Sequence, residues 1–165
     1  MTTSEQAPIP QVFISNDWIQ QERKNMAMTK VFERLYVGSS HDADRLADSN
    51  PDGITAVLNL NAEPNHHWRD GISYVFIPIH EFERISARQF EGLMMTIGQL
   101  IRAGNLLVHC AEGSSRSPVV VAVYMHVVGY MSFDDALSHL RTLRSVVAPS
   151  SLIVERAKVY VEGLI

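Results

Sequence analysis

Apolar residues in this chain follow two patterns: short continuous runs, and longer stretches in which apolar positions recur every three or four residues. Short continuous runs are typical of strands covered on both faces, and the longer spacing is typical of helices that bury one side. The runs predict strands at Val31 to Val37, Ile54 to Leu60, Ile72 to Ile79 and Leu106 to Val108.

Serine residues precede most of the predicted helices. Ser86 and Gln89 form a capping box, and helical spacing continues from there to Gly104. Pro118 suits the first turn of a helix that follows Ser117 and reaches Val128 before Gly129. Other predicted helices are a short one from Asp17 to about Met28 capped by Asn16, one or two turns within 42–48, one capped by Ser132, and a last one beginning at Ser150 or Ser151.

The order of these elements predicts the fold class. A strand, a helix and a second strand in sequence form a right-handed crossover between parallel strands. We therefore expect one α/β domain with a central, mostly parallel sheet of about four to five strands flanked by helices. A chain of 165 residues suits a single domain, which we assign to residues 31–165, with a tail and short helix over residues 1–30.

Composition gives no support to several functional classes, among them nucleic-acid-binding and membrane proteins. The chain is 46% hydrophobic and 19% charged, with a net charge of −4, so charge gives no argument for nucleic acid or an anionic membrane. No apolar stretch is long enough for a membrane helix, and the N-terminus does not resemble a secretory signal. One cysteine leaves no disulfide within the chain. We expect a cytoplasmic protein that binds neither nucleic acid nor membrane, and the sequence leaves its oligomeric state open.

The stretch LLVHCAEGSSRSPVV, residues 106–120, predicts a strand, a tight loop and a helix. Gly113 lets the backbone turn, so that amides from Ala111 to Arg116 face one centre near the positive end of the helix dipole. Such a cup binds an anion, and its amides favour a thiolate at Cys110. Arg116 offers a planar fork for phosphoryl oxygens. The predicted phosphate-binding residues are Ala111, Glu112, Gly113, Ser114, Ser115 and Arg116.

Two neighbouring residues complete the predicted catalytic group. Ser117 is placed to donate its hydroxyl to the sulfur of Cys110 when that sulfur becomes a leaving group, and His109 is expected to orient the loop. The alternative without a function is that Cys110 is an inert buried thiol and Arg116 a surface charge. His66 and His67 are adjacent, but no third ligand is evident, so we predict solvated side chains, no metal site and no cofactor.

The motif HCAEGSSRS resembles the H-C-x5-R-[ST] signature of the cysteine-based protein tyrosine phosphatase superfamily. The flanking VGSS, AVLNL and FIPI stretches resemble a small, atypical dual-specificity phosphatase domain, from about Val31 to the C-terminus. The resemblance implies a phosphatase fold and hydrolysis of phosphomonoesters through a phosphocysteine.

The resemblance also indicates where the general acid lies. In the family it is commonly an Asp two residues after an I-P-x triplet, and the matching position in Ile77-Pro78-Ile79-His80-Glu81 holds Glu81. Glu81 is the predicted acid, with His80 and Glu83 as alternatives in the same loop. This departure from the family pattern leaves a second possibility, a phosphopeptide-binding pseudophosphatase with little turnover.

The residues inside the loop, 111–115, indicate which class of phosphorylated substrate is favoured. Its one ionisable residue, Glu112, is acidic, which disfavours polyanionic lipid headgroups. We expect phosphotyrosine and phosphoserine or phosphothreonine on phosphoproteins or phosphopeptides. Phosphoinositides, glucans and RNA 5′ ends, which other members of the superfamily use, are the alternatives.

Overall fold

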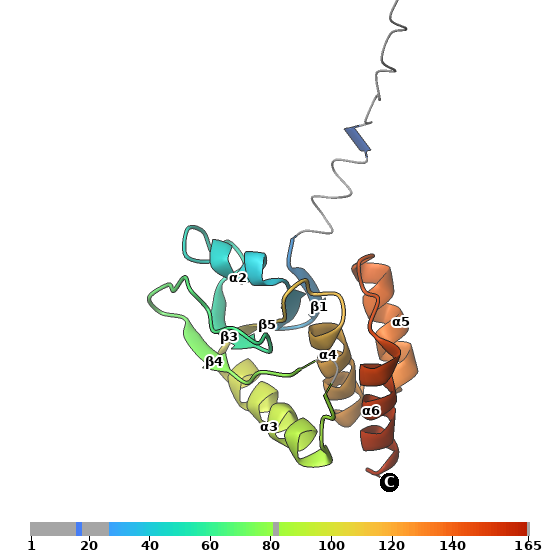
Figure 1. Cartoon of the computed structure of the whole chain (residues 1–165). Coiled ribbons are helices and arrows are strands. Elements are labelled where there is room, and N and C mark those ends of the chain that lie inside the picture. The colour runs from blue at the N-terminus through green and yellow to red at the C-terminus, as the bar shows by residue number, and fades with distance from the viewer. Residues whose placement is uncertain (1–15, 18–26, 81–82, 165) are drawn as a thin grey trace, which may run out of the picture.

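A five-stranded sheet forms the centre of the protein, seen here in a computed structural model that describes residues 16–17, 27–80 and 83–164 (Figure 1). The strands lie in the order β1-β2-β5-β3-β4. Their bounds are Thr29–Phe32 for β1, Leu35–Gly38 for β2, Ile54–Asn59 for β3, Ser73–Phe76 for β4 and Asn105–His109 for β5. The α/β class and the mostly parallel sheet predicted from the sequence are thereby confirmed.

The strand β5 is the centre of the sheet and the last strand of the chain. Val108 lies opposite Val37 of β2 on one side and Leu58 of β3 on the other, and both pairings are parallel. β4 lies at the edge and ends at Phe76, as expected for a strand followed by Pro78. The carboxyl ends of β2, β3, β4 and β5 therefore meet at one end of the sheet, where α/β proteins bind ligands.

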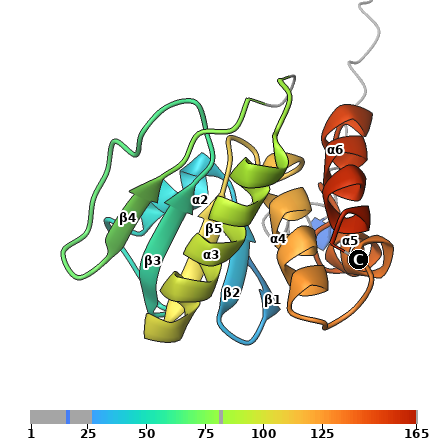
Figure 2. The same ribbon diagram turned by 90° about the horizontal axis from the view of Figure 1, so that it is seen from below.

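Helices cover both faces of the sheet. Figure 2 shows α3 on one side of the sheet and α2 on the other. Alternation along β5 fits this arrangement, because Leu106 and Val108 belong to the core beneath α3 and α4, whereas Leu107 belongs to the core beneath α2. The helices are α2 Ser40–Arg45, α3 Ala87–Ala103, α4 Arg116–Val127, α5 Phe133–Leu143 and α6 Ser151–Glu162.

The helix α4 is surrounded by protein. Every residue from Ser117 to Met125 is buried, because α4 packs against the sheet, α3, α5 and α6. The caps predicted for the neighbouring helices are confirmed: Ser86 and Gln89 form the capping box of α3, and Ser132 and Ser150 cap α5 and α6. No helix of the described residues is long and apolar enough to cross a membrane.

The N-terminal part of the sheet departs from the sequence prediction. The run Val31 to Val37 is not one strand but a hairpin, in which β1 and β2 pair antiparallel around Glu33 and Arg34. Neither turn residue is a Gly, Pro, Asn or Asp, so the usual turn signal is missing. Asn16 and Asp17 are helical, but Ala27 and Met28 are not, and the rest of the helix predicted there lies outside the described residues.

Candidate active site

The candidate site lies at the carboxyl end of the central strand. β5 ends at His109, Cys110 follows, and a loop of five residues leads into α4 at Arg116. Cys110 is 2% exposed, and its Sγ lies 3.2 Å from the Oγ of Ser117 in the first turn of α4. The loop encloses a cavity of about 280 Å³ lined by Cys110, Ala111, Glu112, Ser114, Ser115 and Arg116.

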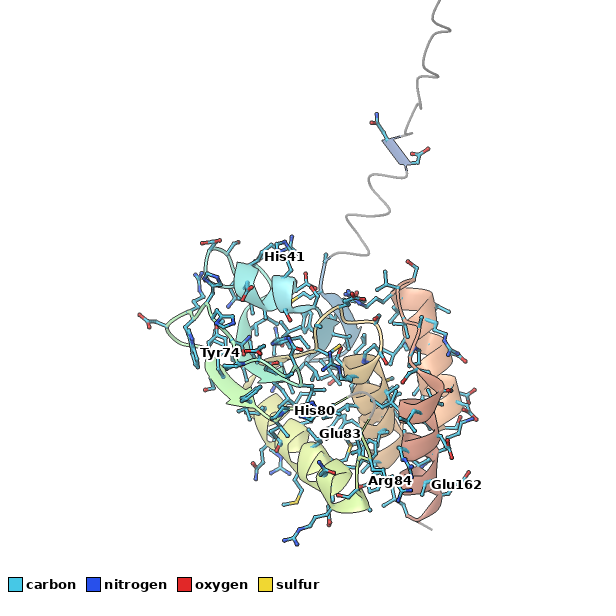
Figure 3. The ribbon with its side chains drawn as sticks, viewed as in Figure 1. His41, Tyr74, His80, Glu83, Arg84 and Glu162 are labelled. Atoms are coloured by element: carbon cyan, nitrogen blue, oxygen red, sulfur yellow. The ribbon has the colours of Figure 1, made fainter. Side chains whose placement is uncertain are left out.

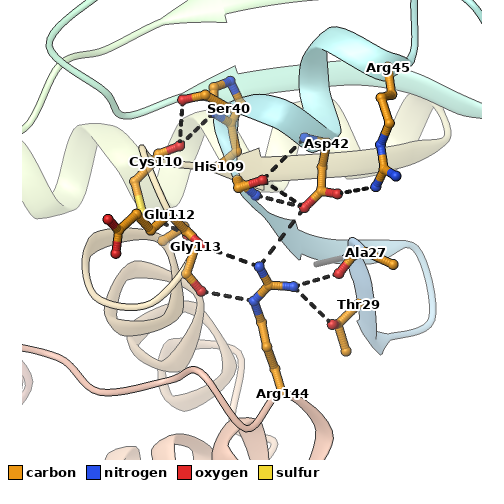
Figure 4. A network of polar contacts seen from close by, with 12 residues as sticks. Ala27, Thr29, Ser40, Asp42, Arg45, His109, Cys110, Glu112, Gly113 and Arg144 are labelled. Atoms are coloured by element: carbon orange, nitrogen blue, oxygen red, sulfur yellow. Dashed lines mark hydrogen bonds and ion pairs between the residues drawn. The ribbon is translucent and has the colours of Figure 1, made fainter. Parts of the chain in front are cut away.

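Five consecutive carbonyl groups of this loop, from Cys110 to Ser114, accept hydrogen bonds from outside it. The donors are Ser40 Oγ and His109 Nδ1 to Cys110, Ser40 N to Ala111, Arg144 Nη2 to Glu112, Arg144 Nε to Gly113, and Ala148 N to Ser114, at 2.9 to 3.3 Å. Figure 4 shows several of these contacts. Since no peptide bond of the described chain is cis, each following N–H points the opposite way, into the loop.

The inward N–H groups have no acceptor of their own. Within the described residues, none of the backbone N–H groups of residues 111–115 donates a hydrogen bond. A ring of free amides at the amino end of a helix favours an anion of the size of phosphate. The loop therefore has the free inward donors that the sequence analysis expected of an anion-binding cup, and we call it the cup below.

Gly113 makes the turn of the cup possible. Its φ of 69° lies in the left-handed region, where glycine is favoured. A Cβ at this position would also lie 2.6 Å from the carbonyl oxygen of Gly38, at the end of β2. Both the conformation and the close approach of two backbones require glycine here.

Arg116 connects the cup to the segment that follows β4. Its Nη1 donates to the carbonyl oxygen of Ile79 at 3.1 Å, which fixes the plane of the guanidinium. Its Nε is buried and has no hydrogen-bond partner. A buried donor without an acceptor is costly, and an anion in the cup is a natural partner for it.

His109 is held as a neutral imidazole. Its Nδ1 faces the carbonyl oxygen of Cys110 at 3.0 Å, and its Nε2 faces the side-chain nitrogen of Asn65 at 3.0 Å. Asn65 uses its oxygen to accept from Asn59, so its nitrogen donates to Nε2, and Nδ1 carries the proton. Burial lowers the pKa of His109, although its hydrogen bond to Cys110 opposes this. A neutral ring bonded on both sides suits an orienting role better than proton transfer.

The segment predicted to carry the general acid is described in part. Glu81 lies outside the described residues. His80 and Glu83 are exposed on the segment between β4 and α3, and the Glu83 N–H donates to the carbonyl of His80 at 3.1 Å (Figure 3). Since Ile79 contacts Arg116, this segment begins beside the cup.

The cup has supports that the sequence analysis missed. Asp42 and Arg144 are each 2% exposed, and Asn59 is 1% exposed. The Ser-x-x-Asp pattern of Ser39 and Asp42 is typical of a helix cap, but it does not indicate that Asp42 is buried in an ion pair. Arg144 follows α5, where a cation is usually a solvated C-terminal residue. No signal in a single sequence joins these distant positions to the cup.

The adjacent histidines lie in the loop between β3 and β4. His66 and His67 are both exposed. No group of three or more His, Cys, Asp or Glu residues suited to hold a metal occurs in the part of the chain that the structure covers.

A strand, an amide-lined loop and a helix, with Cys110 and Arg116 at its two ends, is the arrangement of the cysteine-based phosphatases. The sequence profile described as dual specificity phosphatase, catalytic domain, matches residues 35–156. The chain belongs to the dual-specificity phosphatase family, and this membership supports phosphatase activity.

Two curated relatives and one solved structure are also dual-specificity or related protein phosphatases by name. The chain is 27% identical over 136 residues to protein phosphatase Slingshot of Drosophila melanogaster, covering 81% of this chain and 13% of the relative. It is 29% identical over 123 residues to dual specificity protein phosphatase 2 of Mus musculus, covering 73% of this chain and 39% of the relative. The crystal structure of DUSP15 aligns with a TM-score of 0.74 and 25% identity, covering 82% of this chain and 88% of that one. The matched region thus spans well under half of the length of Slingshot and of dual specificity protein phosphatase 2.

Proposed function

We propose that this protein hydrolyses phosphomonoesters on phosphoproteins, at tyrosine and at serine or threonine, through a phosphocysteine intermediate. The observation that carries the proposal is the outward orientation of five consecutive carbonyls around the Sγ of Cys110, which leaves their N–H partners free for a phosphoryl group. Fixed donors of this kind stabilise the charge that develops on phosphoryl oxygens during transfer.

In the first step, the thiolate of Cys110 attacks phosphorus in line with the ester oxygen. An S–P bond forms and the P–O bond to the leaving group breaks. Arg116 binds two of the phosphoryl oxygens, through its free Nε and the adjacent Nη. A general acid on the segment after Ile79 gives a proton to the leaving oxygen; Glu81 is the assigned residue, with His80 and Glu83 as alternatives.

In the second step, water attacks phosphorus and the S–P bond breaks. The carboxylate left by the first step takes the proton of the water, and inorganic phosphate is released. Ser117 stabilises the departing sulfur, because its hydroxyl is already 3.2 Å from Sγ. The chemistry requires no metal or other cofactor.

The charges around the cup support a protein substrate. Glu112, which lines the cavity and is exposed, places an acidic group beside the entrance. A polyphosphorylated lipid headgroup would be repelled by it, whereas a single phosphate on a peptide meets mainly amides and Arg116.

The test compares the wild-type protein with Cys110→Ser and with the remote control Arg141→Met on an aryl phosphate and on phosphotyrosyl and phosphothreonyl peptides. Hydrolysis that disappears in Cys110→Ser and persists in Arg141→Met supports the enzyme. Unchanged hydrolysis in Cys110→Ser contradicts the proposed nucleophile.

A phosphopeptide receptor is the second candidate, favoured by one observation: the acid position of the family holds Glu81 in place of Asp. The same hydrolysis assay decides between the two functions when binding of the phosphopeptides is measured beside it. Tight binding of phosphopeptides by the wild-type protein, with no release of phosphate, would identify the receptor.

A further inference from the structure

Arg144 is a fully buried cation behind the cup. Its side chain is 1% exposed, although it follows α5 and lies 31 residues after Gly113 of the loop. Nε donates to the carbonyl of Gly113 at 2.9 Å, and Nη2 donates to the carbonyl of Glu112 at 3.3 Å. Nη1 donates to the carbonyl of Ala27 at 2.6 Å and to Thr29 Oγ1 at 3.3 Å. One planar group therefore holds two neighbouring cup carbonyls and anchors them to the start of β1 (Figure 4).

Asp42 is the counter-charge of Arg144. Its Oδ2 lies 3.9 Å from Arg144 Nη2 and accepts from the backbone N–H of Ser39 at 2.9 Å. Its Oδ1 accepts from Arg45 at 2.7 Å. The carboxylate is 1% exposed, so the first turn of α2 fixes it in the protein interior. Burial of one charge without the other would be strongly unfavourable.

Two glycines make room for this pair. A Cβ on Gly38 would lie 2.8 Å from Asp42 Oδ2, and a Cβ on Gly113 would lie 2.7 Å from Arg144 Nη2. The backbone at the end of β2 and at Gly113 of the cup therefore approaches the pair more closely than a residue with a side chain would allow.

We propose that Arg144, held by Asp42, is a positioning residue that sets the geometry of the cup by turning the carbonyls of Glu112 and Gly113 outward, and so the N–H groups of Gly113 and Ser114 inward. The role deepens the proposed phosphatase function and rests on it. Arg144 touches no reacting atom; it acts through the two peptide groups that it holds. The planar guanidinium of an arginine is needed, because its donors lie on three separate nitrogen atoms. A lysine has one ammonium nitrogen, which cannot reach the carbonyls of Glu112 and Gly113 and that of Ala27 together.

Burial and neighbouring groups act on the Arg144 guanidinium in opposite directions. Burial lowers the pKa of its guanidinium, whereas Asp42 and Cys110 oppose this and favour the cation. Glu112 and His41 line a second cavity, next to the cup, together with Arg144. Arg45 donates to the other carboxylate oxygen of Asp42. A cation behind the loop also attracts a thiolate at Cys110.

The test measures tungstate binding by calorimetry, together with kcat and KM for an aryl phosphate, well below the melting temperature of each variant. Arg144→Lys is the main variant, and Arg141→Met, in the exposed last turn of α5, is the matched control. We expect Arg144→Lys to weaken tungstate about tenfold or more and to lower kcat more than it raises KM, since bonds from amides to an anion matter most when charge develops. The control should bind as the wild type does.

Gly38→Ala keeps both charged groups and displaces Asp42, so it tests the same inference should Arg144→Lys fail to fold. It should weaken tungstate severalfold. A folded Arg144→Lys or Gly38→Ala protein that binds tungstate as tightly as the wild type overturns the inference, whatever its melting temperature. If wild-type protein binds tungstate but does not hydrolyse the aryl phosphate, the proposed function fails while the positioning role is still decided by the tungstate data.

Discussion

At the scale of single residues, the contact between Cys110 and Ser117 has the most direct chemical consequence. The two side chains are buried and 3.2 Å apart, so the hydroxyl has few other partners. A hydrogen bond to a charged atom contributes about 1.5 to 3 kcal/mol, and about 1.4 kcal/mol is a factor of ten in rate.

We predict that Ser117→Ala slows hydrolysis of the phosphocysteine about tenfold or more and leaves its formation nearly unchanged. The reason is that sulfur is the leaving group only in the second step. Stopped-flow measurements should therefore show a burst of aryl alcohol followed by a slow phase. A uniform loss in both phases would contradict this division of roles.

We predict that Glu81→Ala reduces turnover of a phosphothreonyl peptide far more than that of a phosphotyrosyl peptide. An alkoxide leaves poorly without a proton, whereas a phenolate, with a conjugate acid of pKa about 10, leaves more easily. Steady-state kinetics on the two peptides measures the difference, with the remote Arg141→Met as the control. Small and equal losses in Glu81→Ala would remove the acid role from Glu81.

The residues that the sequence predicted and those that it missed differ in one respect. Cys110, Gly113, Arg116 and Ser117 stand in one continuous motif, so their types and spacing predict a common site. Asp42 and Arg144 come into contact only in the folded protein. In the sequence, each is typical of an ordinary charged residue at the end of a helix. A buried ion pair of this kind is a property of the tertiary structure, which a single sequence does not encode locally.

At the scale of elements, helix caps were predictable because each is a local bond. Ser132 accepts from the N–H of Asp135 at 3.1 Å in the structure, as its position before an apolar stretch indicated. The hairpin of β1 and β2 was not predictable, because Glu33 and Arg34 give no turn signal and the apolar run continues on both sides.

We predict that Ser132→Ala lowers the free energy of unfolding by about 1 kcal/mol, the usual cost of losing a serine N-cap. The cap lies at the start of α5, and the residue that holds the cup follows its other end, so kcat and KM should not change. Urea unfolding and steady-state kinetics measure the two quantities. A large loss of activity would mean that the position of α5 is coupled to the cup more strongly than its contacts indicate.

At the scale of the whole molecule, the parallel sheet brings distant segments to one place. β2 delivers Ser40 and Asp42, β3 delivers Asn59, and β5 delivers His109 and Cys110, all at the same carboxyl edge. The strand order could be expected only in outline, because crossovers predict parallel strands but not which two strands flank β5.

The buried His109 makes folding depend on pH. Its pKa is lowered in the folded state, so below about pH 6.5 the unfolded chain binds a proton that the folded protein does not. This contribution to stability is therefore full above about pH 6.5 and is lost as the pH falls toward the folded value.

We predict that the free energy of unfolding of the wild-type protein falls between about pH 7.5 and about pH 5.5. The fall should be smaller in His109→Asn, because the asparagine side chain does not titrate. Urea unfolding at the two pH values gives both differences. Equal falls in the two proteins would mean that other groups cause the dependence.

The central claim is that the sulfur of Cys110 carries the phosphoryl group during turnover. The most direct measurement is rapid acid quenching of wild-type protein mixed with an aryl phosphate, followed by mass spectrometry of the peptide that contains Cys110. We predict one phosphoryl group on Cys110 within the first turnover, and none in Cys110→Ser. Turnover without a phosphorylated Cys110, or with the group on another residue, would contradict the account.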